Sequence, residues 1–264
     1  MYSEYSDYTD KRRFVKRLII SPSHDTMLFM NTISIVLVEP QSAGNIGSVA
    51  RAMENTGFSN LALINPVDYK NNEAYSMACN ACGTLLKAKV FTDIRSAIKD
   101  SGLVVGTTRR KGRERYPVLT LQEVIPNILT AAKKNKVSIL FGREDKGLKN
   151  EEIKLCDLLV EIPTHKKYPS LNLSHAVFLT CYELFRAEIP ASPSIKLAPW
   201  EEMEGMYIHL EKTLKKLSYG EKGGKHLLKA IMRSFKRLFG RTGLMQKEVN
   251  MIRGICTQIE ERIK

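Results

Sequence analysis

An alternation of short apolar runs with helical stretches, from Ile33 to about Glu188, constrains the fold of this chain more than any other sequence feature. The runs are nearly continuous in apolar residues, which is typical of parallel strands that helices cover on both faces. They are ISIVLV (33–38), LALI (61–64), AKVF (88–91), LVVGTT (103–108), VSILF (137–141) and LLVEI (158–162). The alternation predicts an open parallel α/β sheet, because six strands are too few for a closed barrel of parallel strands.

Helical periodicity predicts a helix after nearly every expected strand. Helices are expected near 46–56, 73–86, 93–99, 120–134, 150–155 and 173–188. Asp93 and Thr120 are expected N-caps, and T-L-Q-E at 120–123 has the spacing of a capping box. Pro126 has no backbone N–H, so we expect it to break or kink the helix that contains it.

Composition divides the chain into four parts. Residues 1–30 are polar and then basic, and we expect a mostly disordered extension. Residues 31–189 form the α/β domain, and prolines mark 190–199 as a linker. Residues 200–264 are expected to form a small all-α domain whose basic charge suits the binding of RNA. Its helices are expected near 200–217, 224–238 and 244–263.

The middle helix of this C-terminal part has an apolar stripe with cations largely outside it, the pattern of a helix that packs on one face. The stripe consists of Leu227, Leu228, Ile231, Phe235, Leu238 and Phe239. Glycines, among them Gly240 and Gly243, are expected to separate the helices.

The net charge of +13 is the strongest compositional signal, and residues 190–264 carry +7 of it, with 15 basic and 8 acidic side chains. Such a surplus favours a polyanionic partner, nucleic acid first and an anionic membrane surface second, over a basic surface that only aids solubility. No apolar run approaches the roughly 20 residues that span a bilayer, and the first thirty residues lack a secretory signal. Five cysteines, an odd number, suggest reduced thiols in the cytoplasm.

Four turns at the carboxyl ends of expected strands carry the candidate functional residues, because ligands of open α/β sheets bind there. They are EPQSAGNIGSVARAMENTG (39–57), TTRRKGRERY (107–116), GREDKGL (142–148) and PTHKKYPSLNLSHA (163–176).

The first turn offers backbone amides and a helix N-terminus near Asn45–Gly47, which suit an anion or the polar edge of a ligand. Its G-x-x-G spacing fits neither the dinucleotide-binding pattern nor the P-loop. Arg51, further along the helix, can reach back over that end because helical side chains point toward the N-terminus. The alternatives are a helix cap for Asn45 and an exposed surface position for Arg51.

The second turn is either a loop that tracks phosphates or a solvated surface loop, and its place at a strand end favours the former. Its cations are Arg109, Arg110, Lys111, Arg113 and Arg115. In the third turn, Gly142 permits close approach of the backbone to a ligand, and Glu144 is a candidate orienting carboxylate. The alternative for the third turn is a plain connection between a strand and a helix.

Other candidates have simpler explanations. C-N-A-C at 79–82 has no second cysteine pair and no nearby His, so we expect small core residues on the buried side of a helix. His175 is expected to be a structural, hydrogen-bonded imidazole, and the more exposed His165 lacks a nucleophile partner. No carboxylate pair is placed for acid–base hydrolysis, so the residues do not assemble into a hydrolase.

Three of the turns together resemble the SPOUT class of RNA methyltransferases, and more closely its SpoU branch of ribose 2′-O-methyltransferases. The matching motifs are N-x-G-x-x-x-R (Asn45, Gly47, Arg51), F-G-R-E-x-x-G-L (141–148) and S-L-N-L-S-x-A (170–176). The segments VLVEPQSAGNIGSVARAMENTGF, GLVVGTT and LKNEEIKLCDLLVEIP are most similar to the TrmJ subfamily, which modifies transfer RNA. The resemblance covers roughly 33–188, and 190–264 matches only as a helical appendage.

The resemblance implies that the last segments of the α/β domain thread into a deep trefoil knot. It implies a homodimer in which part of each active site comes from the partner subunit, with S-adenosylmethionine as cofactor and no metal. The residues expected around the cofactor are Thr107, Thr108, Gly142, Ile162, Ser170 and Leu171. Arg51 is the expected reactive-site cation. The residues expected to orient Arg51 and the substrate are Glu144, Ser170 and Asn172.

The expected RNA-binding residues are Asn45, Arg110, Lys111 and Arg113. Because Arg keeps its proton far above neutral pH, we expect Arg51 to stabilise a developing alkoxide and grip the adjacent phosphate rather than act as a base. In the TrmJ subfamily the target is the ribose of a pyrimidine at tRNA position 32. The alternatives are ribosomal RNA as substrate, a catalytically silent RNA-binding protein on the same scaffold, and a membrane-surface protein that uses the C-terminal helices.

Overall fold

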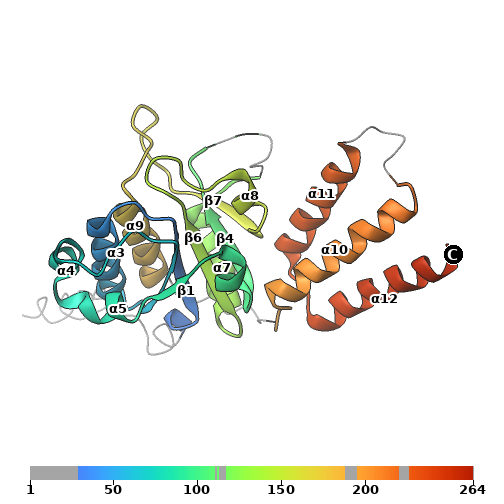
Figure 1. Cartoon of the computed structure of the whole chain (residues 1–264), viewed down its shortest axis with the longest axis horizontal. Coiled ribbons are helices and arrows are strands. Elements are labelled where there is room, and N and C mark those ends of the chain that lie inside the picture. The colour runs from blue at the N-terminus through green and yellow to red at the C-terminus, as the bar shows by residue number, and fades with distance from the viewer. Residues whose placement is uncertain (1–28, 111, 113–116, 188–194, 220–225, 264) are drawn as a thin grey trace, which may run out of the picture.

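The computed structural model describes residues 29–110, 112, 117–187, 195–219 and 226–263, and in this part of the chain seven strands form one parallel sheet (Figure 1). The strand order is β3-β2-β1-β6-β4-β7-β5. The strands are β1 (Ile33–Val38), β2 (Asn60–Ile64), β3 (Lys89–Phe91), β4 (Ser101–Thr107), β5 (Leu119–Thr120), β6 (Lys136–Phe141) and β7 (Leu158–Glu161). The predicted parallel sheet is confirmed. The two-residue strand β5 was not predicted, because so short a pairing has no periodicity of its own.

Helices cover both faces of the sheet, as the apolar strands require. They are α3 (Ala43–Asn55), α4 (Asn72–Ala78), α5 (Cys82–Leu86), α6 (Ile94–Ile98), α7 (Leu121–Ala132), α8 (Asn150–Ile153) and α9 (Leu173–Arg186). The prediction of a single helix over 73–86 is wrong. The backbone of Cys79 has a φ of 51°, and a 3₁₀ turn, Cys79–Ala81, separates α4 from α5.

The caps predicted for α6 and α7 are confirmed, since Asp93 accepts from the amide of Ser96 and Thr120 forms a capping box with Glu123. Pro126 does not break α7, which runs through it. The side chain of Pro126 lies on the exposed face of the helix, so the carbonyl that loses its partner is on the water side.

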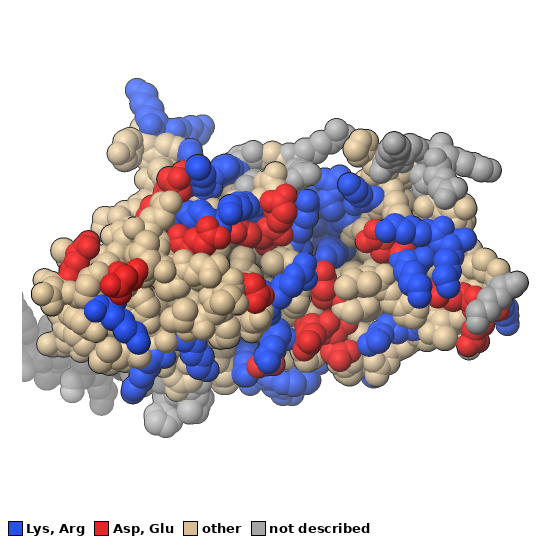
Figure 2. All heavy atoms as spheres, in the orientation of Figure 1, with Lys and Arg blue, Asp and Glu red and all other residues tan. Residues whose placement is uncertain are grey.

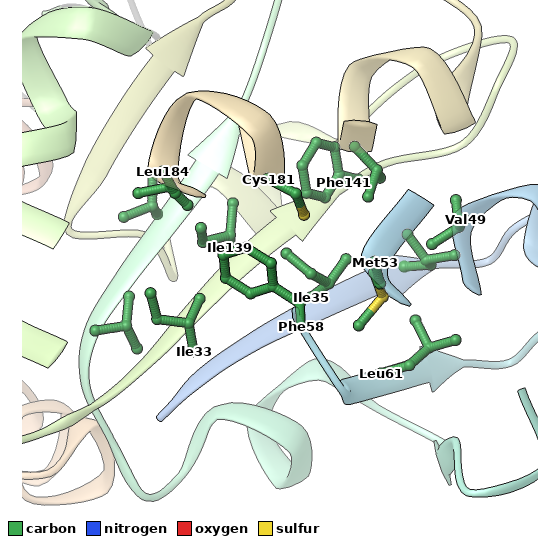
Figure 3. Close-up of a cluster of buried hydrophobic side chains, with 14 of the residues drawn as sticks. Ile33, Ile35, Val49, Met53, Phe58, Leu61, Ile139, Phe141, Cys181 and Leu184 are labelled. Atoms are coloured by element: carbon green, nitrogen blue, oxygen red, sulfur yellow. The ribbon is translucent and has the colours of Figure 1, made fainter. Parts of the chain in front are cut away.

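Side chains of β1 alternate between two hydrophobic clusters, one on each face of the sheet. Ile33 and Ile35 pack with residues of α3, α7 and α9, and Figure 3 shows part of this larger cluster, including Val49, Met53 and Cys181. On the other face Val36 and Val38 pack beneath α6 and α8.

Three further helices, α10 (Trp200–Lys216), α11 (Leu227–Thr242) and α12 (Gln246–Arg262), surround a small cluster of their own. The predicted stripe of α11 is partly right. Leu228, Phe235 and Phe239 pack in this cluster, whereas Leu227 and Leu238 are 39% and 44% exposed. Met232, which the stripe omitted, is buried among them.

The C-terminal helices pack against the sheet beside β4 and β7. Trp200 lies in the smaller cluster of the sheet, and its indole Nε1 donates to the carbonyl of Leu155 at 3.0 Å. Gly240 lies inside α11 rather than between helices, and a Cβ there would come within 2.8 Å of the carbonyl oxygen of Asp157. This glycine therefore permits close packing of α11 on the sheet.

Candidate active site

A cavity of about 480 Å³ lies at the carboxyl ends of β4, β6 and β7. All six residues predicted around the cofactor line it, namely Thr107, Thr108, Gly142, Ile162, Ser170 and Leu171. Arg110 and Glu144 also lie on its wall. Three turns that are far apart in the sequence thus contribute to a single pocket, as expected for the C-terminal edge of a parallel sheet.

Gly142 is essential to the turn after β6, for a reason beyond the one that the sequence predicts. A Cβ at this position would lie 2.1 Å from backbone atoms of Gly147 and Leu148. At Gly142 the backbone therefore approaches the chain itself closely, and the same residue also lines the cavity. Gly147, with a φ of 60°, closes this turn by donating its N–H to the carbonyl of Arg143 at 2.8 Å.

Arg143, which the sequence analysis did not single out, fixes this turn. Its guanidinium Nε donates to Glu39 Oε2 at 2.7 Å, and its NH1 and NH2 donate to both oxygens of Glu152 at 3.0 and 2.8 Å. The side chain is only 4% exposed, so the two carboxylates compensate a buried charge. The hydrogen bond from Arg143 lowers the pKa of Glu39.

A chain of polar side chains joins three of the predicted motifs. Glu144 Oε1 accepts from Asn45 Nδ2 at 3.0 Å, and Glu144 Oε2 accepts from the backbone N–H of Gln41 at 2.9 Å. Asn172 Nδ2 in turn donates to Asn45 Oδ1 at 3.0 Å. The other end of Asn172 caps α9, because its Oδ1 accepts from the amide of Ser174 at 2.8 Å. These contacts orient Asn45 rather than Arg51.

The N-terminus of α3 does not offer the free amides that we predicted. Ser42, not Asn45, is the N-cap, and its Oγ accepts from the amide of Asn45 at 3.1 Å. A carboxylate oxygen of Glu73 accepts from the amide of Gly44 at 3.1 Å. The anion site is therefore filled by the protein itself. Gly47 serves packing, since a Cβ there would lie 2.1 Å from the carbonyl oxygen of Ala74.

Arg51 lies apart from the cavity, on the exposed side of α3. Its NH1 is 3.4 Å from the sulfur of Cys79, which is exposed. The predicted contacts of Arg51 with Glu144 and Asn172 are absent within the described part of the chain. The prediction that Cys79 is a core residue is also wrong, because the buried side of this segment is formed by Ala78 and Ala81.

The remaining predicted residues have mixed outcomes. Lys111 and Arg113 lie outside the described residues. His175 was expected to be a structural, hydrogen-bonded imidazole, but it is exposed because the buried face of α9 is made by Leu173, Val177 and Cys181. Within the described ranges no helix is long and apolar enough to cross a bilayer. No group of three or more His, Cys, Asp or Glu side chains in those ranges could hold a metal ion.

Two family profiles match the chain. The SpoU rRNA Methylase family matches residues 32–182, and the C-terminal domain of tRNA methyltransferase TrmJ matches residues 201–264. The chain belongs to the SpoU methylase family. The match of its C-terminal segment and the relatives described next place it in the TrmJ subfamily.

Relatives of this SpoU methylase cover nearly the whole chain. The tRNA (cytidine-2′-O-)-methyltransferase TrmJ of Methanocaldococcus jannaschii is 39% identical over 223 residues, which are 82% of this chain and 94% of the relative. The tRNA (cytidine/uridine/adenosine-2′-O-)-methyltransferase TrmJ of Pseudomonas aeruginosa is 32% identical, over 88% of this chain and 95% of the relative. The crystal structure of TrmJ from Z. mobilis ZM4 superimposes with a TM-score of 0.72 at 33% identity, over 86% of this chain and 98% of that one.

Proposed function

We propose that this chain is an S-adenosylmethionine-dependent tRNA ribose 2′-O-methyltransferase that acts on cytidine or uridine at position 32 of the anticodon loop. The observation that carries the proposal is that the turns after β4, β6 and β7 line one cavity, and that hydrogen bonds join Asn172 through Asn45 to Glu144 on its wall. The TrmJ relatives, whose names specify 2′-O-methylation of tRNA nucleosides, support the same activity.

The cavity suits the proposed cofactor. Its volume of about 480 Å³ lies within the roughly 300–1,000 Å³ of small-molecule sites. Ile162 and Leu171 offer apolar walls for a planar base, while Thr107, Thr108 and Ser170 bring polar groups to the same space. When bound, the cofactor supplies an electrophilic sulfonium methyl group.

The residues of this chain then have to align the ribose and stabilise the negative charge that develops on its 2′-oxygen. A ribose hydroxyl gains negative charge as it attacks, and a nearby guanidinium stabilises that charge without giving up its own proton. We assign this role to Arg51. Asn45, held by Glu144 and Asn172, presents a fixed amide beside the cavity for the RNA. Arg110 on the cavity wall is placed for a phosphate, and we keep Lys111 and Arg113 in the same role.

We propose a homodimer in which Arg51 completes the active site of the partner subunit. Two observations support it. Arg51 does not line the cavity of its own chain. In addition, α9 leaves three large apolar side chains exposed, Phe178, Leu179 and Tyr182, at 37%, 37% and 43%. Such a contiguous apolar face on a helix next to the cavity is typical of a subunit interface. The five cysteines are all free thiols, which fits the reducing cytoplasm that we propose as the compartment.

The activity is tested by incubating the protein with unmodified tRNA and methyl-labelled S-adenosylmethionine, and by mapping the 2′-O-methyl group. Transfer to position 32 is expected. Transfer to ribosomal RNA fragments instead would favour the alternative substrate, and tight tRNA binding without transfer would favour a catalytically silent protein.

Mixed dimers test the shared site. Arg51→Ala removes the cation, and Ile162→Arg fills the cavity. Each variant alone should be inactive, whereas a mixture should recover part of the activity, because one site of each heterodimer takes both intact residues. A strictly monomeric protein, or a mixture without activity, contradicts the shared site.

A further inference from the structure

The loop between β7 and α9, residues 163–170, projects from the α/β domain beside the cavity. In Figure 1 it rises above the start of α9, and Figure 2 shows Lys and Arg atoms gathered at its tip. Thr164 and Pro169 at the base of the loop line the cavity, as does Lys166 at the tip, so the loop forms part of the cavity wall. Lys167 and Tyr168 are not on that wall, and the tip therefore extends beyond the volume that the cofactor would fill.

Internal hydrogen bonds hold the loop in one shape. The hydroxyl of Thr164 donates to the carbonyl of Pro169 at 3.1 Å, which closes the base. At the tip, the amide of Tyr168 donates to the carbonyl of His165 at 3.0 Å, and the amide of Lys167 donates to His165 Nδ1 at 3.3 Å. Prolines at positions 163 and 169 restrict the backbone at both ends. A tip ordered in this way loses little conformational entropy when it binds a partner.

The tip carries an aromatic ring, Tyr168, directly after two exposed cations, Lys166 and Lys167. Tyr168 is 83% exposed, more than any other large apolar or aromatic side chain of the described residues. No other aromatic ring of those residues packs against it. Lys166 and Lys167 beside it are also exposed. A ring face open to water, with cations adjacent, is the combination that binds an unstacked nucleobase and its phosphates.

We propose that the tip of this loop is a nucleobase-binding site, in which Tyr168 stacks on an unpaired base next to the methylated nucleotide and Lys166 and Lys167 contact the flanking phosphates. The inference rests on the proposed function, because the base must belong to an RNA loop whose ribose enters the adjacent site. Stacking on Tyr168 holds the RNA loop open while the ribose of the target nucleotide enters the methylation site. Since every base has a stacking face, this contact supplies affinity with little sequence preference.

The test uses a hairpin RNA with the unmodified anticodon-loop sequence and 2-aminopurine next to position 32, bound to the full-length protein. The dissociation constant and the 2-aminopurine fluorescence are measured for the wild type, Tyr168→Ala and Tyr168→Phe. The alanine variant should bind about 5- to 100-fold more weakly and lose the fluorescence quenching. The phenylalanine variant keeps the ring and should bind within about twofold of the wild type.

The salt dependence of RNA binding tests the role of Lys166 and Lys167. The double variant Lys166→Ala, Lys167→Ala should lower the slope of log Kd against log salt by about 0.7 for each phosphate that a lysine no longer neutralises. The matched control is Lys87→Ala, Lys89→Ala, which removes two exposed lysines at the β3 edge of the sheet, far from the cavity. This control should leave the slope unchanged.

The outcomes separate this inference from the proposed function. If the wild type methylates tRNA and Tyr168→Ala binds and quenches as the wild type does, the nucleobase site is overturned while the activity stands. If the hairpin binds through Tyr168 but no methyl transfer occurs, the activity is overturned while the site stands. If Tyr168→Ala dissociates the protein into monomers in sedimentation velocity, the ring belongs to a subunit interface and the inference is wrong.

Discussion

Two arginines of the α/β domain have opposite surroundings. Arg143, in the turn after β6, is almost fully buried, and its N–H donors are taken by the carboxylates of Glu39 and Glu152. Arg51, on the surface of α3, is exposed, and the contact of its NH1 is with the weakly accepting sulfur of Cys79. The first guanidinium uses its donors within the fold, while the second keeps donors for another molecule.

This difference supports the proposal that Arg51, rather than Arg143, acts on the substrate. A charge whose donors are all satisfied inside the protein cannot move toward a developing alkoxide without breaking those bonds. Both arginines lie within motifs of the family resemblance, so motif membership alone does not distinguish a structural residue from a functional one. Burial and hydrogen-bond partners distinguish the two arginines.

The largest expected effect is the destabilisation caused by Arg143→Met. Removing the guanidinium leaves Glu152, whose side chain is 12% exposed, as an uncompensated charge. Breaking a buried ion pair in this way costs about 3–5 kcal/mol. Urea denaturation should show a lower midpoint with an unchanged slope. Lys146→Met in the same turn is the control, because that side chain is 75% exposed and its change should stay within about 0.5 kcal/mol. An unchanged midpoint for Arg143→Met would contradict the structural role.

The next effect should fall on catalysis alone. Arg51→Ala removes the proposed stabilisation of negative charge and should reduce kcat by about 10²–10³-fold, the range seen when one such donor is lost. Because Arg51 is exposed, the free energy of unfolding should stay within about 0.5 kcal/mol of the wild-type value. Arg51→Lys is the matched variant that keeps the charge and should retain an intermediate rate. Full activity in Arg51→Ala would remove the contrast between the two arginines.

Local sequence signals predicted most of the fold. The six apolar runs all became strands, and Asp93 and Thr120 cap their helices, because strand burial and capping depend on neighbouring residues. The common edge of the sheet then brought Thr107, Gly142 and Ser170 to one cavity, which the strand-end rule anticipated.

Partners that are distant in sequence could not be predicted. Glu73 fills the N-terminus of α3 from 29 positions away, and Arg143 reaches Glu39 across 104 positions. No periodicity in the sequence encodes either pairing. The positive φ of Cys79 could not be predicted either. A glycine or asparagine at this position would have indicated it, but a cysteine does not. For this reason the anion site at α3 and the burial of Cys79 were predicted wrongly, whereas Cys82 packs against the larger cluster as expected.

A smaller effect is expected from Glu144→Gln, which tests the chain of contacts beside Arg143. The carboxylate accepts from the Gln41 amide and from Asn45 Nδ2, and a glutamine has one acceptor oxygen in place of two. One donor loses its partner, at a cost of about 1 kcal/mol. Calorimetry should show weaker S-adenosylmethionine binding by about fivefold, with a larger loss in RNA binding because Asn45 is released. Glu151→Gln, at an exposed position on α8 that is not on the cavity wall, is the control and should bind both ligands as the wild type does.

The smallest expected effect is on acid stability, through the exposed partner of Arg143. The hydrogen bond from Arg143 lowers the pKa of Glu39 in the folded protein. A carboxyl with a lowered folded pKa stabilises the fold above its unfolded pKa of about 4.3, and this stabilisation disappears as the pH falls through the folded value. The difference in urea midpoint between the wild type and Glu39→Gln should therefore be largest near about pH 7 and shrink toward about pH 3. Glu151→Gln, an exposed position on α8, should show a small difference at every pH. A Glu39 difference that does not change with pH would mean that Arg143 depends on Glu152 alone, and the contrast with Arg51 would then rest on a single carboxylate.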